Sequence, residues 1–198
     1  TRDKKIVLIF DECTSGFREN FGGIHKAFNV DPDIAVFGKA LGNGYAITSI
    51  LGRREVMEVA QKSFISSTFW TERIGPVAAL KTLEVMEKTK SREMIAQMGK
   101  ETRSRWDDLA KKYGLGISHW GLTAIPGFSF NSKNAAAYKT LITQDMLDEG
   151  YLASNSVYCS VAHSNAVVER YFELLEPIFE KIRACEDGED VRKFLKGE

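Results

Sequence analysis

Asp11 and Lys39 carry the side chains with the clearest chemical potential, because each directly follows a short apolar run rich in β-branched residues. The runs cover 5–10 and 34–38, and they predict strands of a parallel sheet that are buried on both faces. Ligands of open α/β sheets bind outside the carboxyl ends of such strands. We therefore expect the Asp11 carboxylate and the Lys39 amine to face one ligand. A lysine that forms a Schiff base and an acid that pairs with a pyridine nitrogen are what a pyridoxal phosphate enzyme requires.

The elements that must position these residues belong to an alternating α/β pattern. Further strands are expected at 46–52 and 122–131, and helices at 53–60, 74–88, 91–113, 135–149 and 165–185. We expect a loop at 61–72 and a short extended pair at 151–158. The last long helix is predicted to begin after a Ser164 cap and to bury Val168, Tyr171, Leu175, Ile178 and Ile182.

The domain boundary is expected near 89–91. Residues 1–90 would then form the C-terminal part of a larger α/β domain, and 91–198 a small α/β domain of their own.

Composition excludes several classes of function. The 198 residues are 43% apolar, enough for a core, while Lys+Arg and Asp+Glu are both 27 with no basic stripe, which argues against nucleic acid as a partner. No apolar stretch approaches the ~20 residues of a membrane span, and the opening residues do not resemble a signal peptide. The cysteines, Cys13, Cys159 and Cys185, have no metal-ligand spacing and fit a reducing, cytoplasmic location. We expect no metal site, and we expect His163 to be structural.

Three motifs in order resemble those of one enzyme family. They are Asp-Glu-Cys-Thr-Ser-Gly-Phe-Arg at 11–18, Pro-Asp at 32–33 and Gly-Lys-Ala-Leu-Gly-Asn-Gly at 38–44. Together they resemble the class III aminotransferases, and within them the glutamate-1-semialdehyde 2,1-aminomutase-like branch. The resemblance implies an α/β fold: the C-terminal part of a fold-type I pyridoxal phosphate-dependent transferase large domain, followed by a small α/β C-terminal domain.

The resemblance also implies roles for single residues. Lys39 would form the Schiff base and move protons, and Asp11 would keep the pyridine nitrogen protonated. Cys13 stands where the family has a branched aliphatic residue against the ring, and Thr14 where it has Gln or Met. Thr68 matches a family threonine that binds the cofactor phosphate across a dimer interface, and donors near a helix start suit that task.

The expected function is amino-group transfer through pyridoxamine phosphate between a small-molecule amino donor and an acceptor, in a homodimer. One alternative is an aminomutase of the glutamate-1-semialdehyde type. The other is a non-catalytic fragment or scaffold, because the chain resembles only the C-terminal half of a family member. On that ground we expect the isolated 198-residue chain to be inactive. The sequence Trp-Thr-Glu at 70–72 departs from the aminomutase pattern and favours a transferase.

Overall fold

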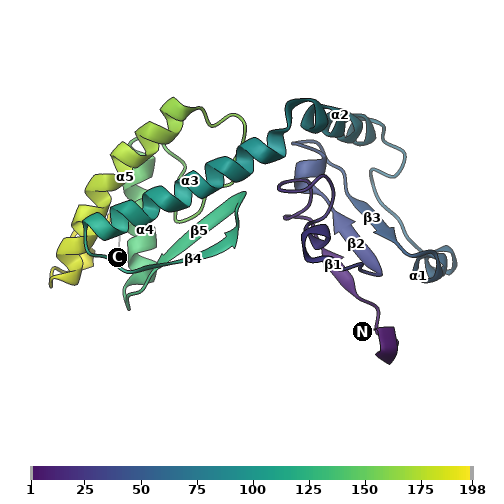
Figure 1. The fold of residues 1–198 in the computed structure, drawn as a ribbon, viewed down its shortest axis with the longest axis horizontal. Helices are drawn as coiled ribbons and strands as arrows, with labels where there is room; N and C mark the ends of the chain where they lie inside the picture. Colours follow the sequence, from purple (N-terminus) through teal and green to yellow (C-terminus); the bar gives the residue numbers. More distant parts are fainter. Residues whose placement is uncertain (1, 197–198) are drawn as a thin grey trace. The chain divides into compact units, whose positions relative to one another are not determined.

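A computed structural model describes residues 2–196, which divide into two compact units, one up to Glu93 and one from Met94. Each unit is an α/β assembly (Figure 1). The first contains strands β1 (Ile9–Asp11), β2 (Ile34–Phe37) and β3 (Ser49–Gly52) with helices α1 (Arg54–Met57) and α2 (Ile74–Thr89). The second contains most of α3 (Ser91–Lys112), then β4 (Ile117–Leu122), β5 (Ile125–Phe130), α4 (Ala135–Asp148) and α5 (Asn165–Glu186). Short 3-10 helices are η1 (Arg2–Lys4), η2 (Ile24–Phe28), η3 (Lys39–Leu41), η4 (Glu58–Lys62) and η5 (Val191–Lys193).

The parallel pairing of β1 with β2 is confirmed. Ile9 lies opposite Ile34 and Asp11 opposite Val36, while β3 runs antiparallel along the other edge of β2. The backbone N–H of Glu12 extends the ladder by donating to the Val36 carbonyl at 2.8 Å. The carboxyl ends of β1 and β2 therefore meet at one edge, as the sequence predicts.

The predicted burial of the first strand is wrong. Regular strand structure begins only at Ile9, and the side chains of Ile6, Val7 and Ile9 are 54%, 47% and 56% exposed. Among the described residues, β1 pairs with a strand on one side only. The apolar run does form a strand of a parallel pair, but that strand lies at the edge of this sheet.

Asp33 fixes how β1 enters the sheet. Its carboxylate is 6% exposed and accepts from the backbone N–H of Leu8 at 2.9 Å. Arg53, directly after β3, lies 3.4 Å from the other carboxylate oxygen. A buried charge is tolerated because donors from two neighbouring chain segments satisfy it. The Pro-Asp pair of the sequence motif thus ties the ends of the three strands together.

One face of this sheet packs on α2. The buried cluster consists of Ala35, Phe37, Leu41 and Ala79, with Phe17, Ile47 and Leu83 packed around it. The predicted amphipathic helix at 74–88 forms, but part of its expected apolar face is open: Val77 and Leu80 are 64% and 70% exposed.

The second unit is built around an antiparallel hairpin. The predicted strand at 122–131 is in fact the turn and second strand of this hairpin, since β4 pairs with β5 from Ile117 opposite Phe130 to Leu122 opposite Ile125. Strand β4 could not be predicted from the sequence, because its side chains are mostly exposed and show no apolar alternation. The expected extended pair at 151–158 does not form a regular strand, but Asn155 and Val157 exchange backbone hydrogen bonds with β5 around a bridge between Ser156 and Gly127.

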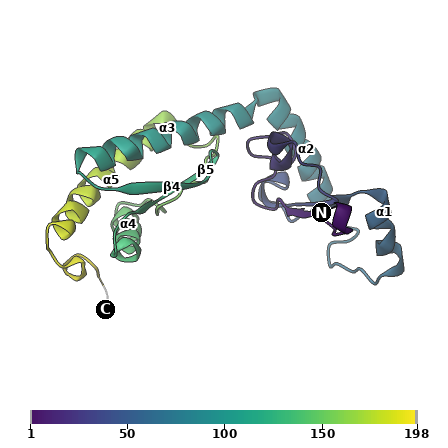
Figure 2. The same cartoon turned by 60° about the horizontal axis from the view of Figure 1, so that its bottom comes forward.

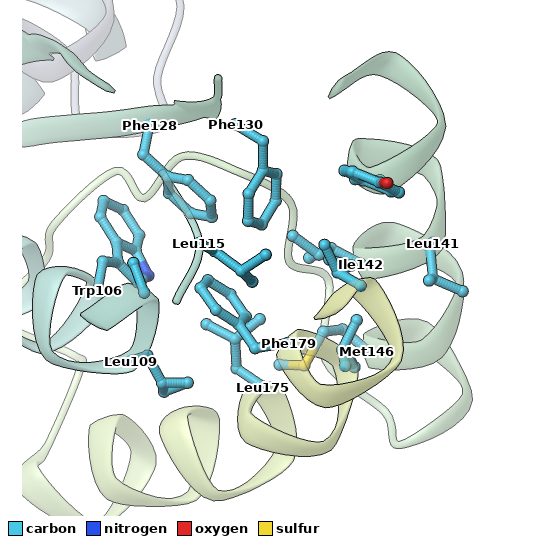
Figure 3. Packing of buried hydrophobic residues seen from close by; sticks show 14 of the residues in the cluster. Trp106, Leu109, Leu115, Phe128, Phe130, Leu141, Ile142, Met146, Leu175 and Phe179 are labelled. Carbon is cyan, nitrogen blue, oxygen red and sulfur yellow. The ribbon is translucent and has the colours of Figure 1, made fainter. Parts of the chain in front are cut away.

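Aromatic rings from β5 and the helices form the core of this unit (Figure 3). Phe128 is fully buried, with its ring 4.7 Å from that of Trp106 on α3 and 6.0 Å from that of Phe179 on α5. The residues predicted for the buried face of α5 all lie in or against this cluster, and Ser164 caps the helix by accepting from the Val167 N–H. Both predictions are confirmed.

Helices α3 and α5 lie side by side (Figure 2). Trp106 donates its indole N–H to the Tyr171 hydroxyl at 3.0 Å in the interior, and Arg105 forms a bidentate pair with Glu169 at the surface. In the part of the chain from residue 2 to 196, no helix is both long and apolar enough to cross a membrane.

Phe128→Ala should lower the free energy of unfolding of the second unit by about 3–5 kcal/mol, because it leaves a cavity among rings that cannot close around it. Urea unfolding followed by circular dichroism measures this loss. Leu152→Ala is the matched control, since Leu152 is 96% exposed and its truncation should change stability by less than about 0.5 kcal/mol. Equal effects of the two substitutions would contradict the assignment of the core.

Candidate functional site

Asp11 and Lys39 stand at the carboxyl ends of neighbouring parallel strands. Asp11 is the last residue of β1, and Lys39 follows β2 after a single glycine and opens η3. Lys39 adopts a left-handed backbone conformation with φ of 43°, and both side chains are exposed. The strained turn directs the chain away from the sheet directly after the strand, so the amine is presented at the strand tip.

The turn after β1 approaches Lys39. The Asp11 carboxylate accepts from the backbone N–H of Cys13 at 3.0 Å, which is an Asx turn. The Lys39 ammonium group donates to Thr14 Oγ1 at 2.5 Å. The structure therefore brings the turn after Asp11 and the lysine together.

Gly38 allows this close approach. A Cβ built on Gly38 would lie 2.7 Å from the Cys13 sulfur, so a side chain there would displace the turn. Cys13 is half-buried, and the small residue at 38 lets its thiol lie against the backbone that leads into Lys39. The two strand tips thus approach each other through small residues, Gly38 and Cys13.

Thr68 does not join this group. It lies in an exposed turn ahead of α2, and in the described part of the chain no hydrogen bond connects it to Asp11, Cys13, Thr14 or Lys39. The start of α2 is instead occupied by Glu72, whose carboxylate accepts from the N–H groups of Gly75 at 3.0 Å and Ile74 at 2.6 Å. These two amides hold the pKa of Glu72 below its ordinary value. The chain's own Glu72 therefore caps the start of α2.

Glu12 is a buried polar residue of this turn, and its hydrogen-bond partners could not be predicted from the sequence. Its side chain is 2% exposed and accepts from the backbone N–H of Ile24, the backbone N–H of His25 at 3.1 Å, and Ser15 Oγ at 3.3 Å. The ring nitrogen Nδ1 of His25 lies 2.5 Å from Glu12 Oε1. Burial raises the pKa of Glu12, but the hydrogen bonds from His25 and Ile24 outweigh it and hold that pKa below the ordinary value.

A hollow of about 660 Å³ lies beside this turn, with Phe17, His25, Phe37 and Arg53 in its walls. Its walls contain neither Asp11 nor Lys39. This hollow is therefore separate from the amine and the carboxylate, which lie exposed at the strand tips.

Comparison with known proteins identifies relatives of this arrangement. A protein-family model described as class III aminotransferase matches residues 1–167. The 3-aminobutyryl-CoA aminotransferase of Cloacimonas acidaminovorans is 40% identical over 139 residues, covering 70% of this chain and 34% of the relative. The glutamate-1-semialdehyde 2,1-aminomutase of Methanocaldococcus jannaschii is 29% identical over 197 residues, covering 91% of this chain and 46% of the relative.

Solved structures agree on the fold. The FumI protein of Sphingopyxis sp. MTA144, in its PLP internal aldimine form, superposes with a TM-score of 0.83 at 20% identity, over 97% of this chain and 47% of that one. An omega-transaminase from Sphaerobacter thermophilus gives 0.79 at 21% identity, over 92% and 46% of the two chains. The predicted fold class is confirmed. The chain spans less than half the length of these curated relatives and solved structures.

Glu12→Gln should lower the free energy of unfolding at pH 7 by about 2 kcal/mol, because a neutral amide accepts the surrounding hydrogen bonds more weakly than a carboxylate. The folded-state pKa of Glu12 lies below its unfolded value of about 4.3, so its contribution is complete above that pH and is lost as the pH falls through the folded pKa.

The difference in stability between the wild type and Glu12→Gln should therefore shrink on acidification below about pH 4. Urea unfolding at a series of pH values measures it. Glu55→Gln is the control, since the Glu55 side chain is 75% exposed and its removal should leave the profile unchanged. A difference that stays constant down to pH 3 would contradict the role of the ionised carboxylate.

Proposed function

This chain belongs to the class III aminotransferases, and from that membership we propose that it provides the lysine and the pyridine-binding acid of a pyridoxal phosphate site for amino-group transfer. The observation that carries the proposal is the position of Lys39 at the tip of β2, with its amine 2.5 Å from Thr14 Oγ1 on the turn that follows Asp11. Amine and acid thus occupy neighbouring strand tips, where ligands of open α/β sheets bind.

The residues at the strand tips fit the family's cofactor. The Lys39 amine is exposed and can be reached by an aldehyde, and the Asp11 carboxylate is exposed on the adjacent strand end. Gly38 and Cys13 place no bulky side chain at the strand tips, which suits the binding of a flat ring. When bound, pyridoxal phosphate supplies an electron sink for the carbon that carries the amino group.

Each residue of the site has a proposed task. Lys39 binds the cofactor through its amine and then moves the proton at the substrate carbon. Asp11 orients the pyridine nitrogen and keeps it protonated. Cys13 lies against one face of the ring, and Thr14 holds the lysine amine when that amine is not bound to the cofactor. Thr68 is proposed to bind the phosphate from the second copy of a dimer, which accords with its exposed position ahead of α2.

Transfer between two molecules is the reaction we propose first, with a small-molecule amino donor and acceptor. The relative with 40% identity is a 3-aminobutyryl-CoA aminotransferase, so a 3-aminoacyl thioester is the first amino donor to assay. The second candidate is an aminomutase, which is supported by the 29% identity to the Methanocaldococcus jannaschii enzyme over 91% of this chain. Release of a free keto product with an external acceptor distinguishes the two reactions.

We propose that the protein acts as a cytoplasmic homodimer. Its free cysteines suit a reducing compartment. The dimer face is the α2 patch, defined as the apolar residues Phe69, Trp70, Ile74, Val77 and Leu80, which are 57–70% exposed. Residues three and four apart lie on one side of a helix, so the members on α2 form a continuous surface. Thr68 directly precedes this patch, so a second copy seated there would place its threonine beside the interface.

Lys39→Ala should abolish covalent attachment of pyridoxal phosphate and reduce transfer by roughly 10²–10⁴-fold, the usual contribution of a general acid–base residue. The test is borohydride reduction of the loaded gene product that contains this chain, followed by peptide mapping. We expect the label on Lys39 in the wild type and in the control Lys62→Ala, which removes another exposed lysine of the first unit. A label on any other lysine would refute the site, and labelled protein without turnover would favour the scaffold alternative.

Val77→Asp should weaken dimerisation at least about tenfold, because it places a charge in the centre of an apolar interface. Sedimentation velocity over a concentration series measures the dissociation constant. Leu152→Asp is the control, since Leu152 is an apolar residue of the other unit and is 96% exposed. Dimers that withstand Val77→Asp would show that the α2 patch is not the interface.

A further inference from the structure

The carboxylate of Glu12 is the centre of a buried hydrogen-bond network behind the candidate site. It is bound by the backbone N–H groups of Ile24 and His25, by the His25 ring and by Ser15. The Glu12 carboxylate already accepts from two backbone N–H groups, and an ionised carboxylate can only accept, so the contact with the His25 ring is satisfied when Nδ1 donates. The pair therefore joins the end of β1 to the start of η2 by a charge-assisted contact.

The backbone of Glu12 is held as firmly as its side chain. Its N–H donates to Val36 on β2 at 2.8 Å, and its carbonyl accepts from the N–H of Gly16 at 2.8 Å. Between these two anchors lies the short turn that carries Cys13 and Thr14. Because both ends of this turn are attached to Glu12, the position of the Thr14 hydroxyl depends on where Glu12 is held.

The His25 ring has little freedom to move. It packs edge-on against the ring of Phe10, with centroids 6.1 Å apart and planes at 78°. On its other side, a Cβ built on Gly23 would lie 2.2 Å from His25 Nδ1 and 2.5 Å from Glu12 Oε1. The ring and the carboxylate thus fit against bare backbone, which fixes their geometry.

We propose that Glu12 and His25 form a clamp that positions the turn bearing Thr14, and through the contact of Thr14 with Lys39 sets the direction of the lysine amine. Both are positioning residues, since neither lies among the groups assigned to the cofactor. The effect of the clamp on catalysis rests on the proposed function. The clamp itself is a property of the folded chain, so it can be tested without cofactor.

The test compares two substitutions of His25 in the gene product that contains this chain. His25→Asn places an amide nitrogen where Nδ1 stands and retains the donor, while His25→Phe retains a ring against Phe10 and removes the donor. His119→Asn is the matched control, because His119 pairs with Asp107 at 2.7 Å in the second unit. Deuterium exchange of the backbone amides of residues 13–16 is measured in cofactor-free protein.

The clamp predicts exchange at 13–16 about tenfold faster in His25→Phe, and within about twofold of the wild type in His25→Asn and His119→Asn. In the enzyme loaded with cofactor, kcat should fall in His25→Phe and stay near the wild-type value in His25→Asn and His119→Asn, with little change in KM. The double variant His25→Phe with Thr14→Val should have a kcat no lower than that of the slower single variant. Unchanged exchange in His25→Phe, or equal disturbance by Asn and Phe, would overturn the clamp.

Failure of the clamp and failure of the proposed function give different results. If the wild type takes no label at Lys39, the exchange experiment still decides whether the clamp exists. If Lys39 is labelled and exchange is equal in all variants, the function stands and the clamp is refuted. If His25→Phe also raises exchange in residues 94–196, it disturbs the whole fold, and Glu12→Gln is measured in its place. Unchanged exchange at residues 13–16 in Glu12→Gln then refutes the proposal.

Discussion

The parallel pairing of β1 with β2 is the contact on which the candidate site depends. Parallel strands bring their carboxyl ends to the same edge of the sheet, so the residues that follow them become neighbours although the chain between them is long. The register, with Asp11 opposite Val36, sets how far apart the acid and the lysine stand. Asp33 holds the other ends of the strands. A shift of one residue would turn Asp11 to the opposite face and separate the two groups.

The two units are stabilised in different ways. The second unit contains a core of aromatic and aliphatic side chains on α3, β5, α4 and α5 (Figure 3). The first has a small buried cluster around Phe37 and relies on satisfied polar groups, chiefly Asp33 and Glu12, to fix its turns. A polar network defines the geometry of its residues, but it is sensitive to substitution, because the loss of one partner leaves a buried polar group without a hydrogen bond. It is this unit that carries Lys39.

Much of this arrangement could be predicted from the sequence, because local patterns determine it. The apolar runs before Asp11 and Lys39 indicate the strands, and the spacing of Tyr171, Leu175 and Ile182 indicates the buried face of α5. The exposure of Ile9 and the existence of strand β4 could not be predicted from the sequence. Both depend on which other strands pair with these segments in the folded chain. The burial of Glu12 could not be predicted for the same reason, because it depends on the approach of Ile24 and His25.

Gly23 shows how far the influence of such a network extends. Every missense change at this position adds a Cβ, and the space it would need is already taken by the His25 ring and the Glu12 carboxylate. The constraint on this residue therefore comes from a contact to which it contributes no side chain. In a related protein, a side chain at the equivalent position would be a marker that the carboxylate–imidazole pair has been lost or rearranged. The residue type at position 23 thus indicates whether the interaction between Glu12 and His25 can form.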